Sequence, residues 1–384
     1  MFKVYNTQFN VASDLKNFFK NVVNNISKPH LKLIPYIILG MIQAESIVTS
    51  DIVKKLKGDF SFVQPFSNIR RLERFFNNPK FNIYYFYDCI IKYVISNFKS
   101  KNNNIYIAFD HMYCRDDFTI LLFSLRIGKQ GIPLWFRCFK GMENPEAFKT
   151  QLILDGISYT YNLFKDKKYN LIFLADRWFP NTQTLSFIDS IGATYCVRAR
   201  NNLSIRINDF EYADTIGSIA DIEPFLTKSK FFDNVTITKN DFHTKLAVSK
   251  SESHNEPFFI LTNGNTRDAI KHYGYRFGSI EFIFKNQNLM ASILKILKCV
   301  TCIPLKLSSG LMCVALLWLT ILGADYSKNK NHFKNFLKIN YSKKNGLCHK
   351  RTFSIFNTGL FYFNLAFESS RKATIKCNFL LYDI

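Results

Sequence analysis

The sequence lacks three features that would assign it to common classes of protein. It has nine cysteines, an odd number, with no secretory signal peptide before the first of them, so a secreted disulfide framework is not expected. It has no run of about 20 apolar residues, which a bilayer-spanning helix needs. The most apolar stretch, 310–324, is shorter and predicts a buried helix, and no internal repeat is found. We therefore expect a cytoplasmic protein with reduced thiols and no membrane span.

Acidic residues are scarce relative to basic ones. The chain has 51 Lys and Arg residues against 29 Asp and Glu residues, a formal net charge of +22 at pH 7. Such a positive field attracts a polyanion, although charge alone does not distinguish nucleic acid from an anionic membrane. With 384 residues, the chain exceeds the roughly 250–300 residues at which a single core stops growing, so more than one structural unit is expected.

Residues 1–100 have the pattern of short helices and predict a helical DNA-binding region. Helical spacing of apolar residues is found in 33–44, 50–58 and 67–78. Ser50 and Ser67 stand in positions typical of N-caps. The last helix is amphipathic, so its apolar side can face a core while its arginines meet phosphates. These arginines are Arg70, Arg71 and Arg74. An ordinary solvent-exposed basic face explains each arginine equally well when it is taken singly.

Residues 101–200 have the pattern of the first part of a mixed α/β core. Runs of β-branched and aromatic residues occupy 104–110, 118–128, 131–139, 170–176 and 193–199. Helices are predicted at 144–164, with Asn144 as its cap and Pro145 at its first position, and at 180–192. The order of three strands, helix, strand, helix and strand matches the ribonuclease-H-like layout of a mixed sheet flanked by helices.

The rest of the chain divides into three predicted regions. Residues 201–256 contain short polar strand-like segments and are expected to form a β-rich insertion. The second part of the core occupies 257–325, where a strand is followed by a helix from about Asn265 to Met290. Residues 326–384 form a C-terminal tail, for which dimerisation is a candidate role.

Two aspartates end predicted strands. Asp110 follows the segment NIYIAF, and Asp176 follows NLIFLA, so both carboxylates are expected at one edge of the same sheet. An unpaired carboxylate on a buried strand is costly, so this placement favours an oxygen-rich site for Mg²⁺, with Mn²⁺ as a substitute. Two such ions can activate a water or a 3′-hydroxyl and stabilise the leaving oxygen during attack on a phosphodiester. Strand-ending aspartates are also common at turns, so neither residue is specific alone.

A third segment carries further candidate residues. The sequence HYGYRFGSIEFIFKNQN at 272–288 brings an aromatic ring, a cation and a carboxylate together after the last predicted core strand. Glu281 can complete the metal site, while Tyr273 and Arg276 are suited to hold the phosphate beside a scissile bond. An amphipathic helix with ordinary surface charges is the alternative for this segment taken alone.

Together these segments resemble the insertion-sequence DDE transposases, particularly the Insertion Sequence Four family, whose third-carboxylate helix carries a Tyr, Arg, Glu, Lys signature. The resemblance spans about residues 30–325 and rests on IAFDHMYC, IPLWFRCFKG, FLADRWFPNTQTLSFIDSIGATYCVRAR, LTNGN and YGYRFGSIE. It implies a ribonuclease-H-like core with a β insertion before the glutamate. It also implies Asp110, Asp176 and Glu281 as catalytic metal ligands, with Tyr273 and Arg276 as contacts to transposon-end DNA.

The same resemblance implies the partners and the location of the protein. Its partners would be double-stranded transposon ends with terminal inverted repeats and a target DNA, bound by a homodimer in the synaptic complex. No membrane partner is expected, and the location would be bacterial, cytoplasmic and nucleoid-associated.

Two positions depart from the family signature. Four residues separate Arg276 from Glu281 where the family has three, which on a straight helix places the two side chains about 140° apart. A helix that begins later or carries a bulge would remove this conflict. Asn288 stands where the family has its lysine, and Lys285, one turn after the glutamate, is the candidate substitute as a DNA contact. The segment 288–304 also differs from the family, and a compensated pair of frameshifts is one hypothesis for it.

Three functions therefore stay open. The first is an active transposase that cuts and joins DNA. The second is a catalytically inactive, transposase-derived DNA-binding protein, which Asn288 and the altered spacing favour. The third is another ribonuclease-H-like nuclease, which keeps the carboxylates but needs no terminal repeats. Trp178, close after Asp176, is expected in the core or wall of the site and not as a platform for a base.

Overall fold

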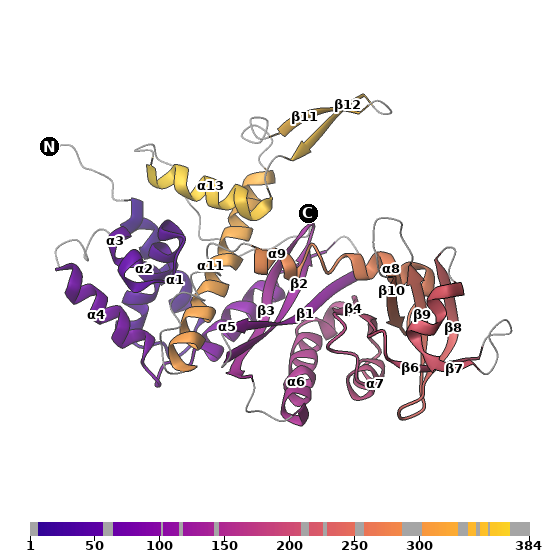
Figure 1. Cartoon of the computed structure of the whole chain (residues 1–384). Coiled ribbons are helices and arrows are strands. Elements are labelled where there is room, and N and C mark those ends of the chain that lie inside the picture. The colour runs from indigo at the N-terminus through magenta and orange to yellow at the C-terminus, as the bar shows by residue number, and fades with distance from the viewer. Residues whose placement is uncertain are drawn as a thin grey trace.

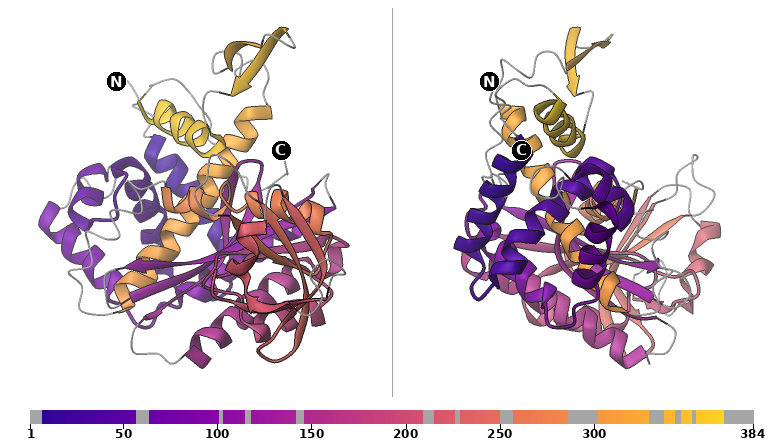
Figure 2. Two further views of the ribbon diagram at one scale, coloured as in Figure 1. Left: turned by 45° about the vertical axis from the view of Figure 1, so that its right-hand side comes forward. Right: turned by 90° about the vertical axis from the view of Figure 1, so that its left-hand side faces the viewer.

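The computed structural model describes residues 7–56, 64–100, 103–114, 118–141, 146–208, 215–225, 229–249, 257–285, 302–328, 337–342, 346–351 and 354–368. These residues form a ten-stranded mixed sheet with helices on both faces, a group of helices at one end of the sheet, and a two-stranded hairpin (Figures 1 and 2). The fold class is mixed α/β, which is compatible with the predicted ribonuclease-H-like core.

Five helices precede the sheet. They are α1 (Thr7–Val22), α2 (Lys28–Ala44), α3 (Thr49–Lys55), α4 (Pro65–Phe76) and α5 (Ile83–Ser96). The three predicted helices are confirmed as α2, α3 and α4, whereas α1 and α5 were not predicted. Ser50 and Ser67 are not N-caps, because α3 begins after Val48 and α4 begins after Gln64 with Pro65 in its first turn. The fixed φ of proline suits that first turn and moves the start of α4 forward.

Helix α4 has the amphipathic character that its sequence predicts. Leu72, Phe75 and Phe76 are buried. Arg70 and Arg74 are exposed, and Arg71 is half-buried. The guanidinium of Arg70 lies over the ring of Phe66, 4.4 Å from its centroid. The structure therefore provides the exposed basic face that phosphate contacts would require.

The first half of the sheet contains β1 (Asn104–Cys114), β2 (Phe118–Ile127), β3 (Gln130–Lys140), β4 (Asn170–Ala175) and β5 (Thr194–Arg198) in the order β3-β2-β1-β4-β5. The pairs β3–β2 and β2–β1 are antiparallel, and β1–β4 and β4–β5 are parallel. Helix α6 (Glu146–Phe164) precedes β4, and α7 (Thr182–Ser190) connects β4 to β5. Parallel neighbours need such crossovers, so the predicted element order is confirmed. The predicted cap residues Asn144 and Pro145 lie outside the described residues.

The second half continues the same sheet. Its strands are β6 (Ser204–Ile207), β7 (Thr215–Ser218), β8 (Lys230–Ile237), β9 (Phe242–Ser249) and β10 (Phe258–Thr262). They follow β5 in the order β10-β9-β8-β6-β7, and all their pairings are antiparallel. The strands from 201–256 therefore extend the core sheet at its far end (Figure 1).

Helices cover both faces of the sheet. Helices α6 and α7 lie on one face, and α8 (Thr266–Gly274) and α9 (Ile280–Lys285) lie on the other (Figure 1). On the first face the ring of Phe123 stacks on Phe109 with centroids 4.8 Å apart. On the second face the backbone of Ser279 lies so close to Gly131 of β3 that a Cβ at Gly131 would collide with it. A glycine at 131 therefore lets the α8–α9 segment lie directly on the sheet.

The longest helix, α11 (Cys302–Lys328), packs against α2, α5, β3 and α13 (Ile355–Glu368). Its segment Ile303–Asp325 is long and apolar enough to cross a membrane, and it is buried inside the protein; α2 and α3 pass the same test only as one bent pair. The buried helix is confirmed, but its predicted length is wrong. The apolar segment begins earlier, at Ile303, and the polar Ser308 within it is accommodated because its hydroxyl donates to the carbonyl of Pro304.

Two segments complete the described part of the chain. Strands β11 (Leu337–Ser342) and β12 (Gly346–Arg351) form the separate hairpin. Helices α11 and α13 pack closely where Gly323 faces Gly359. A Cβ at either position would collide with the backbone of the other helix, so glycine allows this close approach. The tail from 326 onward therefore contributes a helix to the packing around α11.

Candidate active site

The register of β1 against β4 brings the two predicted aspartates together. The parallel pairing ends with Phe109 opposite Ala175. Asp110 and Asp176 directly follow these two residues, so both lie at the level where the pairing of β1 with β4 ends. The predicted convergence of these positions at one edge of the paired strands follows directly from this register.

Asp110 does not end its strand, which corrects the sequence prediction. Strand β1 continues to Cys114. It does so because β2 still pairs with it, from Asp110 opposite Leu122 to Cys114 opposite Phe118. Asp110 is instead the first residue of β1 beyond its pairing with β4. From Asp110 onward, β1 is paired with β2 on one side and, among the described residues, is unpaired on the side of β4.

The alternation of β1 decides which face Asp110 occupies. Successive side chains of a strand point to opposite faces. Ser124, opposite Ala108 in the register, shares a hydrogen bond of 2.8 Å with Ser279 between α8 and α9. Asp110 has the same parity as Ala108 and therefore points to the face that α8 and α9 cover.

The helix predicted from Asn265 to Met290 is broken, and the break removes the spacing conflict. Helix α8 ends at Gly274, residues 275–279 form turns, and α9 begins at Ile280. Arg276 thus lies in the turns and Glu281 in the first turn of α9. Because the two are not on one straight helix, Arg276 Nη1 reaches Glu281 Oε1 at 3.1 Å.

Arg276 is the centre of the site. Its Nη2 donates to Asp110 Oδ2 and lies 3.9 Å from Asp176 Oδ2. Its side chain is 5% exposed, while those of Asp110, Asp176 and Glu281 are 17%, 26% and 24% exposed. Three carboxylates from β1, the end of β4 and α9 therefore converge on one buried guanidinium.

Tyr273 completes the group from the last turn of α8. Its hydroxyl donates to Asp176 Oδ1 at 3.3 Å, and the residue is buried. Burial and the Asp176 carboxylate raise the pKa of Tyr273 well above its usual range, so the hydroxyl remains a donor. The five residues that the sequence singled out around the carboxylates are all brought together.

The remaining predicted residues lie elsewhere. Lys285 is the last residue of α9, and its side chain is not among those described. Asn288 lies outside the described residues, as does most of the segment 288–304. Arg70, Arg71 and Arg74 are on α4, in the group of N-terminal helices beyond the β3 end of the sheet (Figure 1).

The charges at the site are strongly coupled. Burial raises the pKa of the Asp110 carboxyl, and this effect outweighs the opposing influence of Arg276 and of the His111 backbone N–H, which donates to Asp110 Oδ1 at 2.8 Å. Burial alone acts to lower the pKa of Arg276, but Asp110, together with the other acidic groups around it, raises it above its ordinary value. The guanidinium is therefore firmly cationic and neutralises part of the carboxylate charge.

The donor atoms suit a hard divalent cation, but the arginine stands among them. Within the described part of the chain, no group of three or more His, Cys, Asp or Glu side chains is arranged to hold a metal ion. The three carboxylates are the oxygen ligands that Mg²⁺ and Mn²⁺ prefer. They would fit such ions once Arg276 no longer bridges them.

Trp178 was expected in the core or wall of the site, and the core position is wrong. Its side chain is 65% exposed. The neighbouring Phe179 occupies the core position instead, with its ring 4.7 Å from that of His111. The sequence motif could not decide between two adjacent aromatic residues, because a turn and not a regular strand follows Asp176.

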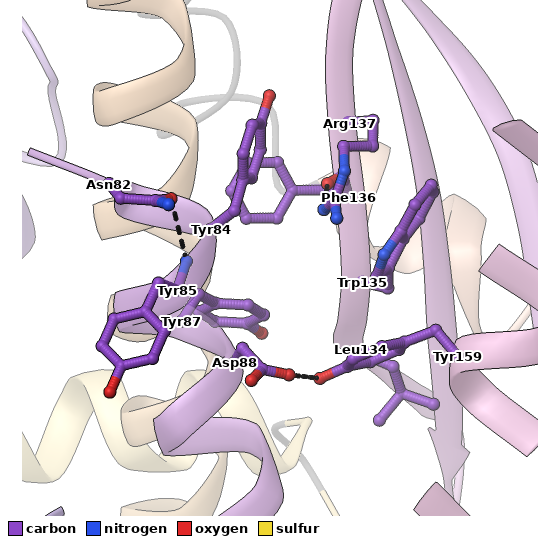
Figure 3. A pocket seen from close by; sticks show the side chains of 10 residues that line it. All are labelled: Asn82, Tyr84, Tyr85, Tyr87, Asp88, Leu134, Trp135, Phe136, Arg137 and Tyr159. Atoms are coloured by element: carbon purple, nitrogen blue, oxygen red, sulfur yellow. Dashed lines mark hydrogen bonds between the residues drawn. The ribbon is translucent and has the colours of Figure 1, made fainter. Parts of the chain in front are cut away.

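A cavity of about 270 Å³ lies away from the carboxylates, between α5, β3 and α6 (Figure 3). Tyr159 points across it from α6, and its hydroxyl donates to Asp88 on α5 at 2.6 Å. The guanidinium of Arg137 lies 4.4 Å from the ring centroids of both Tyr84 and Trp135. Asp88 also pairs with Lys92, so both charged groups of this cavity have partners, as expected for a joint between the N-terminal helices and the sheet.

No model of a known protein family matches the chain. No curated protein matches it either.

Solved structures that match the chain include three complexes with nucleic acid. Endonuclease V from Ciona intestinalis, in complex with a 24-mer DNA containing an inosine followed by a ribo-adenosine, is 13% identical over 44% of this chain and 75% of that chain, with a TM-score of 0.27. A variant of that enzyme with a 23-mer DNA is 11% identical over 55% of this chain and 96% of that chain, with a TM-score of 0.30. Argonaute from Marinitoga piezophila, in complex with guide RNA and target DNA, is 15% identical over 56% of this chain and 31% of that chain, with a TM-score of 0.23. Because these scores are low, the function of this chain has to be argued from its own site.

Proposed function

We propose that the chain is a transposase that cuts and joins DNA strands at the ends of an insertion sequence. The observation that carries the proposal is the convergence of Asp110, Asp176 and Glu281 on one point, with Arg276 and Tyr273 beside them. These residues come from three separate segments of the chain, at 110, 176 and 273–281. The same five residues match the Tyr, Arg and Glu of the transposase signature and the two aspartates that accompany it in that family.

The three carboxylates would hold two divalent ions, Mg²⁺ or Mn²⁺. When bound, these ions supply an activated water or 3′-hydroxyl and stabilise the leaving oxygen of a phosphodiester. The protein's own contribution is to fix three hard oxygen ligands at the edge of a rigid sheet. Because β1 and β4 are held by ladder hydrogen bonds up to Phe109 and Ala175, the two aspartates are positioned before substrate arrives.

Arg276 would exchange one anionic partner for another. In the described part of the chain its buried Nε has no hydrogen-bond partner, so its present position leaves a donor unsatisfied. A phosphate beside the scissile bond offers charge-assisted hydrogen bonds of the same kind as the carboxylates. Asp110, Asp176 and Glu281 would hold the divalent ions, and the guanidinium would then be free to contact the phosphate. Tyr273, held by Asp176, would border the same strand.

The proposal extends to the partners of the protein. The basic face of α4 would contact the phosphates of the terminal inverted repeats, and Lys285 would contribute a further cation at the site. Two copies would hold two transposon ends together before strand transfer to target DNA. Such a protein would act at the bacterial nucleoid.

Cleavage of DNA that carries the inverted repeats flanking this gene tests the proposal. With Mg²⁺, the protein is expected to cut at the repeat boundary, and Mn²⁺ is expected to support cutting as well. The amide variants D110N, D176N and E281Q keep side-chain size and remove charge, so each is expected to lose cutting while end binding in a gel-shift assay persists. Full cutting by all three variants would refute the metal-ligand assignment.

A catalytically inactive DNA-binding protein is the second candidate, and the position of Arg276 favours it. A guanidinium bridging three carboxylates neutralises part of their charge without a metal ion, as a site that no longer needs one would do. Such a protein would bind the inverted repeats without nicking them under any divalent ion. The same cleavage assay therefore separates the two candidates directly.

A further inference from the structure

Trp178 is exposed to solvent in the turn that follows Asp176. It follows Asp176 by two residues and is 65% exposed, whereas Phe179 is 1% exposed. The Phe179 backbone N–H donates to the Asp176 carbonyl at 3.1 Å, and its ring packs 5.0 Å from that of Phe109. This tight turn fixes the direction of Trp178. A large ring that is both exposed and fixed has the character of a binding surface.

Arg200 approaches the same indole from the next strand. Strand β5 pairs in parallel with β4 up to Val197 opposite Ala175, so the segments that follow both strands leave the sheet together. Arg200 Nε donates to the carbonyl of Arg177 at 3.0 Å. Its guanidinium carbon lies 4.6 Å from the centroid of the Trp178 ring. One side of the indole thus carries a positioned planar cation, and its exposure leaves surface for a second partner.

A groove opens around this pair. Its cavity of about 820 Å³ is lined by Arg177, Trp178, Pro180, Asn181, Arg200, Asn202, Leu203, Ser204, Thr238 and Lys239. An adjoining hollow of about 420 Å³ shares Arg177, Trp178 and Arg200. The lining combines three cations with amide and hydroxyl groups and contains no acidic residue. We call this surface the indole groove.

We propose that the indole groove binds an unpaired nucleotide of the DNA strand that enters the carboxylate site. A base would stack on the exposed indole surface, since every base offers a π-face to an aromatic platform. Arg177, Arg200 and Lys239 would contact the flanking phosphates. Amide and hydroxyl groups such as those of Asn202 and Ser204 can donate to or accept from the edge of a base. A DNA strand is the proposed occupant because Arg177, which lines the groove, directly follows Asp176 in the chain. The inference rests on the proposed function and specifies the form of its substrate.

Tryptophan fluorescence tests binding without requiring cleavage. Trp135 and Trp318 are buried, so quenching by a stacked base reports on Trp178. The full chain is titrated in EDTA with three DNAs of one sequence: a blunt duplex, a duplex with an unpaired tail, and a duplex whose tail is abasic. Only the tail with bases is expected to quench strongly and to bind more tightly than the blunt duplex. Replacing the indole by W178A is expected to remove roughly tenfold or more of this preference.

Matched variants separate stacking from charge and from general destabilisation. The W178F variant keeps a ring and should retain most of the preference for the tail, whereas R200A should weaken binding of both tailed and blunt DNA. F231A removes another exposed aromatic ring, on β8, and K165A removes an exposed cation at the opposite end of β4. Both control variants should behave like the unmodified protein. Thermal melting of each variant checks that it is folded.

The outcomes decide the proposal separately from the proposed function. Equal preference for the tail in W178A and the unmodified protein would overturn the groove assignment. Competition by free mononucleotides as strong as that by the tailed duplex would also overturn it, because the groove would then bind a small molecule. Base-dependent quenching in a protein that never cuts DNA would keep the groove and reject the transposase. Cutting of DNA without base-dependent quenching would support the transposase and reject the indole groove as a nucleotide-binding site.

Discussion

Arginines in two regions of this molecule have opposite surroundings. Arg276 is 5% exposed and bridges three carboxylates at the edge of the sheet. Arg70 and Arg74 are exposed on α4, where Leu72, Phe75 and Phe76 turn the apolar side of the helix inward. The first guanidinium neutralises acids within the protein, while the others face solvent. The same residue type therefore serves internal charge balance where the pairing of β1 with β4 ends and forms a basic outer surface on the N-terminal helices.

The net charge of +22 therefore does not identify which cations contact DNA. A buried arginine held by carboxylates contributes little to the field outside the protein. Exposed arginines on an amphipathic helix contribute fully, and salt screens them. Replacing the buried and the exposed arginines separately tests whether they act on different partners.

The largest effect is expected from Arg276→Ala. Removing the guanidinium leaves three partly buried carboxylates in mutual repulsion, so the metal-free protein should lose roughly 3 kcal/mol of unfolding free energy, the low end for breaking a buried ion pair because the carboxylates are partly exposed. Mg²⁺ or Mn²⁺ should then stabilise this variant more than the unmodified protein, since no arginine competes for the carboxylates. Urea unfolding in EDTA and thermal melting at increasing metal concentration measure both effects.

Arg276→Lys provides the control, because it keeps a cation at the same place while losing the planar fork. Its metal response should lie between those of the alanine variant and the unmodified protein. Identical metal-induced shifts in all three proteins would contradict the idea that the arginine and a metal ion compete for one position.

Much of the fold follows from local sequence patterns. Strands β1 to β5 and the helices between them were predicted because apolar runs alternate there with clear turn signals. Helix α5 was not predicted because its sequence IYYFYDCIIKYVIS is apolar on several sides, so neither a helical nor a strand period stands out. The pairing of β10 with β5 depends on contacts between distant segments, and no local pattern encodes it.

The site was predictable in its membership but not in its arrangement. Asp110, Asp176 and Glu281 could be chosen from residue type and position after apolar strands. The sequence suggests the break between α8 and α9 only as one possibility. The break depends on Ser279 packing against the distant Gly131. The central position of Arg276 was not foreseen because it results from folding three segments around one side chain.

A smaller effect is expected from acid on the N-terminal helices. Asn78 accepts from the Lys80 backbone N–H through its Oδ1, so its Nδ2 is the donor toward His30 Nε2 at 3.1 Å. Burial lowers the pKa of His30, so its neutral, accepting form is favoured in the folded protein. The unfolded chain takes up this proton near pH 6.5. Stability should therefore fall as pH drops from that value through the lower pKa of the folded state.

The change should amount to about 1 kcal/mol or less, the worth of one hydrogen bond, since His30 is only half-buried. His30→Gln keeps an acceptor that does not titrate in this range. The difference in unfolding free energy between the two proteins, measured at pH 7.5 and pH 5, isolates the contribution of His30 because all other groups are shared. Parallel pH curves for the two proteins would show that this histidine does not couple folding to pH.

The smallest effect, in the affinity for end DNA, compares the two arginine environments directly. Each phosphate contact contributes about 0.9 to the slope of log K against log salt concentration on duplex DNA. Arg70→Ala and Arg74→Ala should each reduce the slope by about one, because these side chains are exposed and would release counterions from the DNA. In EDTA, Arg276→Ala should leave the slope unchanged, since its guanidinium stays with the carboxylates.

Divalent ions should abolish this contrast if Arg276 changes partners. With Mg²⁺ and an end DNA that terminates in a 3′-deoxynucleotide, strand transfer is prevented while the site is loaded. Arg276 would then face a phosphate, and the unmodified protein and Arg276→Ala should differ in slope by about one under the same ionic conditions. A difference that is present in EDTA and unchanged by Mg²⁺ would mean that Arg276 leaves the carboxylates for DNA without any metal ion. In that case the arginine responds to the strand alone, and the carboxylates would be left to attract the cations only afterwards.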